Sequence, residues 1–219
     1  MKSIALYDLD RTITVAPTFT PFLVHMAART SGWRLLGFPI WIAAMLGYKL
    51  RLYSRGALKR FGLTLLIGHE VQNPRLQGAI DAFVDKQIAR NIRPGALRQI
   101  EQDRASGMLL VLVTAAPEIY ANAIAERLRL SACIATRHVR TAQGNLLAAI
   151  DGGNNYGTEK VRRVESWLHQ SGIDRHTVTI RAYTDHASDA PILDFADQGV
   201  LVGSFAKPSP RWQHADWGR

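Results

Sequence analysis

Continuous apolar runs alternate with amphipathic segments through most of the chain. The clearest run is MLLVLV at residues 108–113, and shorter ones lie at residues 3–7, 133–136, 178–183 and 199–202. Uninterrupted runs of this length are typical of parallel strands covered on both faces. Segments with helical spacing of apolar residues separate them, at residues 96–106, 117–129 and 158–171. The alternation predicts an α/β fold, a Rossmann-like doubly wound parallel sheet with helices on both faces.

Residues 15–90 follow a different pattern, with apolar residues at loosely helical spacing. Ser54 is a plausible helix N-cap, and Asn73-Pro74 begins an amphipathic helix that runs to Arg90. Pro94-Gly95 then breaks the pattern. We therefore predict a helical cap inserted after the first strand. In this division residues 1–14 plus 91–219 form the α/β core, and residues 15–90 form the cap.

The composition is that of a globular protein, with 47% hydrophobic and 21% charged residues among 219. The only cysteine, Cys133, lies in an apolar run, so no internal disulfide is possible and we expect a reducing compartment. The apolar stretch behind Met1 is too short for a signal peptide. A cytoplasmic location is therefore expected.

The net charge of +9 is unevenly distributed. Residues 11–69 contain no Asp or Glu but eight basic residues, almost the entire excess. Such a block predicts that the cap has a surface that faces something anionic.

Polar side chains follow the apolar strands at the points where these end. Asp8 and Asp10 come after the first strand, Thr114 follows residues 108–113, and Asp185 and Asp189 follow residues 178–183. The carboxyl ends of parallel strands meet at one edge of a sheet, so these carboxylates are expected to converge there. A hard divalent cation with oxygen ligands offsets their repulsion, and Mg²⁺ is the common choice. Lys160, at a helix start, adds a further positive charge.

This constellation resembles the haloacid dehalogenase superfamily of phosphohydrolases. Asp8-Leu9-Asp10-Arg11-Thr12 matches its first motif, DxDxT, Thr114 the second, Lys160 the third, and Asp185 with Asp189 the fourth. The segments IRPGALRQIEQDRASGMLLVLVTAAP and DHASDAPIL are most similar to the branch of phosphoserine phosphatase and phosphatidylglycerophosphatase-like enzymes. The resemblance covers nearly the whole chain. The helical insert predicted at residues 15–90 corresponds to what the family calls a type-1 cap.

The resemblance implies a phosphatase that works through an aspartyl-phosphate, with Asp8 as nucleophile and Asp10 as general acid and base. Thr114 and Lys160 would hold phosphate oxygens, and Ala115 and Arg11 would contact the substrate. Mg²⁺ would be bound by Asp8, Asp185 and the backbone carbonyl of Asp10. Asp189 belongs to the same metal-site group, and we expect it to orient Lys160 or a metal-bound water.

Each assignment has a simpler alternative. Asp8 and Asp10 could be a helix cap and a loop acid, and Thr114 a plain turn residue. Lys160 could be a solvated helix lysine, and Asp189 an N-cap. Arg11 departs from the small residue often found at its position in the superfamily, and it contacts the substrate or points to solvent.

The cap bears on the substrate. Phosphoserine phosphatases carry a cap glutamate seven residues after the second motif-one aspartate, and here that position is Pro17, which counts against phosphoserine. Residues 35–48 are uncharged and too short to span a bilayer, so they form a buried helix or an interfacial segment. In the interfacial case Trp33, Trp41, Tyr48 and Tyr53 would lie at headgroup depth, and the basic residues, Lys59 included, would engage anionic lipid.

We therefore predict a Mg²⁺-dependent phosphomonoester hydrolase, with a phosphorylated small molecule or a lipid-headgroup phosphate as substrate, at the inner face of the membrane in the lipid case. A soluble small-metabolite phosphatase and a phosphotransferase are the alternatives among enzymes. The alternative outside enzymes is a basic nucleic-acid- or membrane-binding protein with a vestigial site. Nucleic acid is not expected, because the basic residues are interleaved with aliphatic stretches rather than stacking aromatics. The sequence does not fix the oligomeric state.

Overall fold

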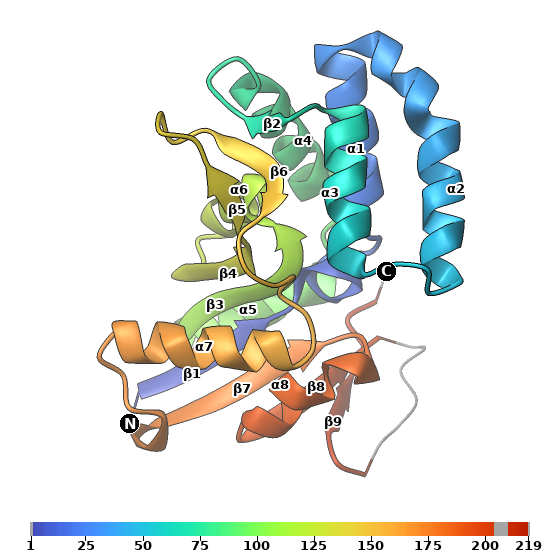
Figure 1. Cartoon of the computed structure of the whole chain (residues 1–219). Coiled ribbons are helices and arrows are strands. Elements are labelled where there is room, and N and C mark those ends of the chain that lie inside the picture. The colour runs from blue at the N-terminus through green and yellow to red at the C-terminus, as the bar shows by residue number, and fades with distance from the viewer. Residues whose placement is uncertain (1, 204–209, 219) are drawn as a thin grey trace.

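A six-stranded parallel sheet forms the centre of the computed structural model, which describes residues 2–203 and 210–218 (Figure 1). The strand order is β4-β3-β1-β7-β8-β9, and every neighbouring pair is parallel. The strands are β1 (Lys2–Tyr7), β3 (Leu109–Pro117), β4 (Ala132–Thr136), β7 (Val178–Thr184), β8 (Gln198–Val202) and β9 (Gln213–Ala215). The predicted fold class is confirmed.

The central strand β1 is buried on both faces, which explains why its sequence is apolar throughout. Ile4 and Leu6 belong to one apolar cluster, with residues of α7 and α8. Ala5 and Tyr7 point to the opposite face and belong to the cluster that includes residues of α5 and α6. These helices are α5 (Pro94–Ala105), α6 (Glu118–Arg127), α7 (Thr158–Gln170) and α8 (Ala190–Phe195).

One predicted boundary is wrong in a way that concerns the site. The strand predicted at residues 108–113 continues to Pro117, so Thr114 and Ala115 lie within β3 and not beyond it. Pairing with β4 shifts register between Val113 and Pro117. Irregularities of this kind re-aim side chains and are frequent beside active sites.

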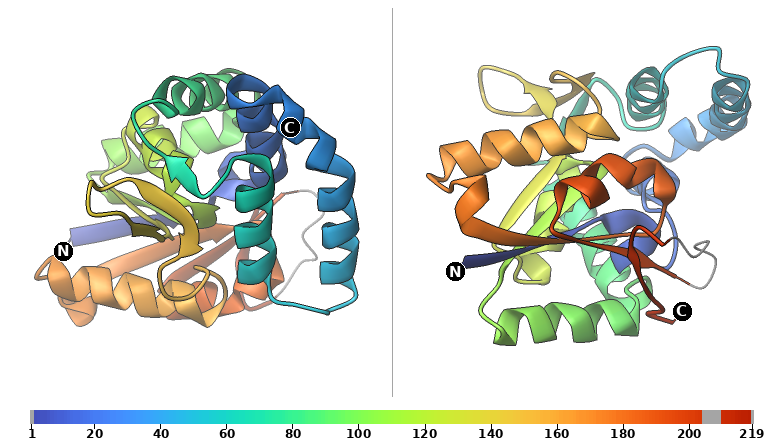
Figure 2. Two further views of the ribbon diagram at one scale, coloured as in Figure 1. Left: turned by 45° about the horizontal axis from the view of Figure 1, so that its top comes forward. Right: turned by 90° about the horizontal axis from the view of Figure 1, so that it is seen from below.

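The segment between β1 and α5 forms a helical layer beyond the carboxyl edge of the sheet (Figures 1 and 2). Its helices are α1 (Phe19–Thr30), α2 (Phe38–Lys49), α3 (Arg55–Leu66) and α4 (Gln77–Arg90). Its one strand, β2 (Glu70–Gln72), pairs with the hairpin of β5 (His138–Arg140) and β6 (Leu146–Ile150) in the order β2-β6-β5. The division into a core and a cap at residues 15–90 stays a prediction.

The C-terminal segment folds back onto the core. The buried Trp217 ring lies 5.2 Å from that of Tyr183, and a Cβ at Gly95 would lie 2.4 Å from the Trp217 carbonyl oxygen. The Arg93 side chain donates both to the Gly218 carbonyl of the tail and, at 3.2 Å, to the Arg11 carbonyl. The tail therefore supports the turn that follows β1.

Within the described ranges, 2–203 and 210–218, the helices are too short or too polar for any of them to cross a bilayer.

Candidate active site

A cavity of about 340 Å³ lies at the carboxyl edge of the sheet. All eight site residues predicted from the sequence line it: Asp8, Asp10, Arg11, Thr114, Ala115, Lys160, Asp185 and Asp189. They come from four separate elements, the turn after β1, the end of β3, the start of α7 and the loop after β7. The expected convergence of strand ends therefore occurs, while the individual roles stay predictions.

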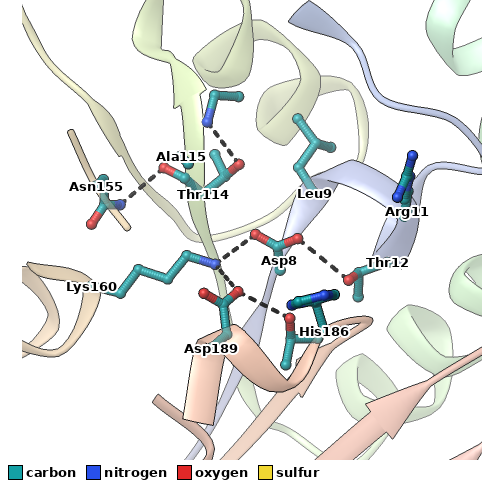
Figure 3. A network of polar contacts seen from close by, with 12 residues as sticks. Asp8, Leu9, Arg11, Thr12, Thr114, Ala115, Asn155, Lys160, His186 and Asp189 are labelled. Carbon is teal, nitrogen blue, oxygen red and sulfur yellow. Dashed lines mark hydrogen bonds and ion pairs between the residues drawn. The ribbon is translucent and has the colours of Figure 1, made fainter. Parts of the chain in front are cut away.

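Lys160 lies between two carboxylates, as Figure 3 shows. Its Nζ donates to Asp8 Oδ1 at 2.7 Å and to Asp189 Oδ2 at 2.6 Å, and only 2% of its side chain is exposed. Thr184 Oγ1 also donates to Asp189 Oδ2, at 3.0 Å. Asp189 makes no side-chain cap of α8, so its carboxylate serves this network and not the helix end.

The network determines which groups carry charge. Burial raises the pKa of Asp8 to about 7, although Lys160 opposes the rise. Burial also disfavours the charge on Lys160, but Asp8 and Asp189 together hold its pKa above the usual range. The site therefore keeps Lys160 charged. A further cation beside Asp8 would stabilise the ionised form of that carboxylate.

Asp10 is held by a residue that the sequence did not single out. Its Oδ1 accepts from the backbone N–H of Thr18 at 2.8 Å and from the Thr18 hydroxyl at 2.7 Å. The Thr18 hydroxyl lies 2.9 Å from the hydroxyl of the buried Tyr120. The chain turns sharply to allow this, with Arg11 in the left-handed region at φ 63°. Asp10 is thereby fixed two residues from Asp8 without competing for Lys160.

Thr114 and Ala115 present different groups to the cavity wall. The Thr114 hydroxyl is buried and accepts from the Ala116 N–H at 3.0 Å, while Asn155 Nδ2 donates to the Thr114 carbonyl at 3.0 Å. The Ala115 carbonyl accepts from Thr136 Oγ1 at 2.8 Å and from Lys59. Arg11 is exposed at the cavity wall. A phosphate oxygen could thus meet a hydroxyl proton at Thr114 and a guanidinium at Arg11.

The residues present fit a bound Mg²⁺. Asp8, Asp10 and Asp185 line one cavity, and burial raises the pKa of Asp185. Asp189 Oδ1 is buried and has no hydrogen-bond partner among the described residues. Among the described residues no group of three or more His, Cys, Asp or Glu side chains is placed so that it could hold a metal ion. That does not oppose Mg²⁺, which usually takes one or two carboxylates, several waters and substrate phosphate.

Two residues that line the cavity were not among the site residues predicted from the sequence. Arg55, at the start of α3, and Tyr156 line the cavity, and the Arg55 guanidinium lies 3.9 Å from the Tyr156 ring centroid. Arg55 Nε also donates to the Tyr48 hydroxyl at 3.1 Å. Their long-range approach could have been found only from the tertiary structure.

The expected lipid-facing set needs correction. Lys59 is buried and donates to the Ala115 carbonyl and, at 2.6 Å, to Asn154 Oδ1, so it joins α3 to the core and does not face outward. Trp41 is also buried, against Gly62 of α3. Tyr53 is half-buried and donates to the Ala44 carbonyl. Trp41 is buried where α2 packs on α3, and Lys59 is buried where α3 packs on the core.

The family model for haloacid dehalogenase-like hydrolases matches residues 5–194, which include all eight predicted site residues. The chain belongs to this family. The resemblance stated from the motifs is therefore confirmed at the level of the superfamily, and the protein is a hydrolase of haloacid dehalogenase type.

Individual proteins similar to this chain have low sequence identity to it, between 18% and 28% for the three described here. Protein CicA of Caulobacter vibrioides is 28% identical over 193 residues, covering 88% of this chain and 82% of CicA. A Bordetella pertussis protein of unknown function superposes with a TM-score of 0.87 at 23% identity, with both chains fully covered. A phospho-aspartyl intermediate analogue of phosphoserine phosphatase gives 0.63 at 18% identity, covering 100% of this chain and 94% of that one. Likeness at these identities shows a shared fold.

Proposed function

We propose that this protein is a Mg²⁺-dependent phosphomonoester hydrolase that works through an aspartyl-phosphate on Asp8. The observation that carries the proposal is the buried Lys160 ammonium between Asp8 and Asp189, at the same cavity as Asp10, Thr114 and Asp185. Membership of the hydrolase family supports the reaction class. The fold shared with a phosphoserine phosphatase held as its phospho-aspartyl analogue supports the intermediate.

In the first step a carboxylate oxygen of Asp8 attacks phosphorus, and the bond from phosphorus to the leaving alkoxide oxygen breaks. Lys160 holds the other oxygen of Asp8 and limits the rotation of the carboxylate. Asp10 gives its proton to the leaving alkoxide, and Thr18 fixes the carboxyl that does so. Thr114 and Lys160 stabilise the negative charge on the phosphoryl oxygens.

In the second step Asp10, now ionised, takes a proton from a water molecule as this attacks phosphorus. The bond between phosphorus and Asp8 breaks, and inorganic phosphate leaves. Asp10 thus returns to its first state. Bound Mg²⁺, held by Asp8, Asp185 and the Asp10 carbonyl, would neutralise charge on the phosphoryl group.

We propose a lipid-headgroup phosphate as the substrate class, on the cytoplasmic side of a membrane. What supports this is the cap: Pro17 stands where an ammonium-binding glutamate would be needed, and Arg55 reaches the cavity. A substrate with further negative charge is therefore favoured over one with an ammonium group.

The test is a phosphatase assay with p-nitrophenyl phosphate, with Mg²⁺ and with EDTA. Turnover is expected only with Mg²⁺, and Asp8→Asn should abolish it while leaving the circular dichroism spectrum unchanged. A panel of phosphoserine, sugar phosphates and phosphatidylglycerol phosphate then ranks the substrate classes. Full activity in Asp8→Asn would rule out the mechanism, and a preference for phosphoserine would rule out the lipid class. Phosphate transfer to added glycerol would identify a phosphotransferase.

A further inference from the structure

Helix α2 is apolar on its outer side. In residues 38–49 only Lys49 is charged, and Trp41 is the one side chain of α2 that is fully buried. Ile42 and Leu46, one turn apart, are 46% and 59% exposed. A surface helix of a globular protein normally carries polar residues on that side. α2 therefore exposes the kind of surface that folding usually removes from water.

The exposed apolar surface extends beyond α2 in both directions. We define the α2 face by Leu36, Ile40, Ile42, Leu46, Leu50 and Leu52. Leu36 is 81% exposed and Leu52 is 72% exposed. Figures 1 and 2 show α2 as the outermost helix, on the side of α3 that faces away from the sheet. Exposed apolar side chains gathered on one helix and its flanking residues favour an interaction site.

The charges beside the α2 face indicate its occupant. Lys49 and Arg51 are exposed between Leu46 and Leu52 of the face, and residues 11–69 contain no acidic residue. Trp33, 69% exposed, lies beside the face under the Arg34 guanidinium. This combination suits an anionic lipid surface. There the apolar side chains and the tryptophan lie at the boundary between headgroups and acyl chains, and the basic residues lie at the anionic headgroups. A symmetric dimer through the same face would bring two sets of like charges together.

The α2 face adjoins the cavity. Arg55, which lines the cavity, follows Leu52 by three residues and donates to the hydroxyl of Tyr48 on α2. We propose that the α2 face docks the protein on the surface of an anionic bilayer and so brings the Asp8 cavity to phosphomonoesters carried there. The proposal rests on the proposed function for the reaction but names the partner surface independently of it.

The test compares vesicle binding of the full-length protein and its variants. Vesicles of phosphatidylglycerol with phosphatidylcholine, and of phosphatidylcholine alone, are sedimented at low and high NaCl. Leu46→Glu/Leu50→Glu should weaken binding to the anionic vesicles at least about tenfold, because it places charge at the acyl boundary. Lys49→Gln/Arg51→Gln should weaken it at low salt only. Leu97→Glu, at a 43% exposed leucine on α5, is the matched control and should bind like the wild type.

Activity separates this proposal from the proposed function. Hydrolysis of p-nitrophenyl phosphate should be equal in the wild type and in Leu46→Glu/Leu50→Glu, whereas hydrolysis of phosphatidylglycerol phosphate in vesicles should fall with binding. Asp8→Asn should still bind vesicles. Wild-type protein that stays in the supernatant, or equal weakening by Leu97→Glu, would overturn the docking face while leaving the enzyme mechanism intact. A dimer in analytical ultracentrifugation that Leu46→Glu/Leu50→Glu dissociates would assign the face to a second copy and would also overturn the proposal.

Discussion

Two lysines are buried near the same cavity, and their surroundings shift their pKa values in opposite directions. Lys160, on α7, is 2% exposed and lies between the carboxylates of Asp8 and Asp189, which hold its pKa above the usual range against the effect of burial. Lys59, on α3, is 7% exposed and donates to two neutral oxygens, so burial lowers its pKa to about 7. Burial alone therefore does not determine the charge of a lysine; the charge of its partners does.

The largest expected effect comes from removing the lysine that has the carboxylate partners. Lys160→Met should lower kcat for p-nitrophenyl phosphate by about a thousandfold or more, because no cation then holds Asp8 or balances charge in phosphoryl transfer. Lys59→Met is the matched control and should keep kcat within about tenfold, since Lys59 contacts Ala115 and Asn154 and no carboxylate. Equal losses of kcat in the two variants would show that the carboxylate partners of Lys160 give it no special role in catalysis.

Asp189 is expected to act on Lys160 and not as a main ligand of Mg²⁺. Asp189→Asn should lower kcat about tenfold to a hundredfold, because Lys160 loses one of its two anionic partners. The Mg²⁺ concentration that gives half-maximal activity should stay the same. A large increase in that concentration would instead identify Asp189 as a metal ligand.

The part of the site that the sequence predicted lies at strand ends. Asp8, Thr114 and Asp185 each follow an apolar run, and parallel topology alone brings such positions to one edge. Asp189 follows the same run as Asp185, whereas Lys160 was predicted from its place at a helix start and from the motif spacing.

The part that the sequence did not predict depends on how the helical layer meets the sheet. Arg55 and Lys59 reach the site from α3, and Thr18 reaches Asp10 from the N-cap of α1. Nothing in the local sequence distinguishes these three from other polar residues of the helical layer. The buried side of α2 was equally hidden, because a helix that is apolar all round has no periodicity to select Trp41 over Ile42. Pairwise packing, and not propensity, settles these positions.

The depressed pKa of Lys59 should show in the pH dependence of stability. Its folded pKa of about 7 lies below the ordinary value of 10.5, so between these values the unfolded chain binds more protons. The free energy of unfolding should therefore rise with pH, by up to about 2 kcal/mol between roughly pH 7.5 and 9. Lys59→Met should flatten this rise in urea titrations at several pH values. Parallel curves for wild type and variant would contradict the depressed pKa.

The smallest effect is expected from making the surroundings of Lys59 resemble those of Lys160. Asn154→Asp replaces a neutral acceptor 2.6 Å from Lys59 Nζ by a carboxylate, and Thr136 Oγ1, at 3.2 Å from the same oxygen, can still donate to it. The added charge should raise the pKa of Lys59, so that the unfolding free energy gains about 1 kcal/mol near neutral pH and its rise towards pH 9 disappears. Asn154→Ala removes the acceptor without adding charge and should keep the rise. If the unfolding free energy of Asn154→Asp still rises towards pH 9, the charge of the partner does not set the pKa of Lys59. The different pKa values of Lys59 and Lys160 must then come from burial.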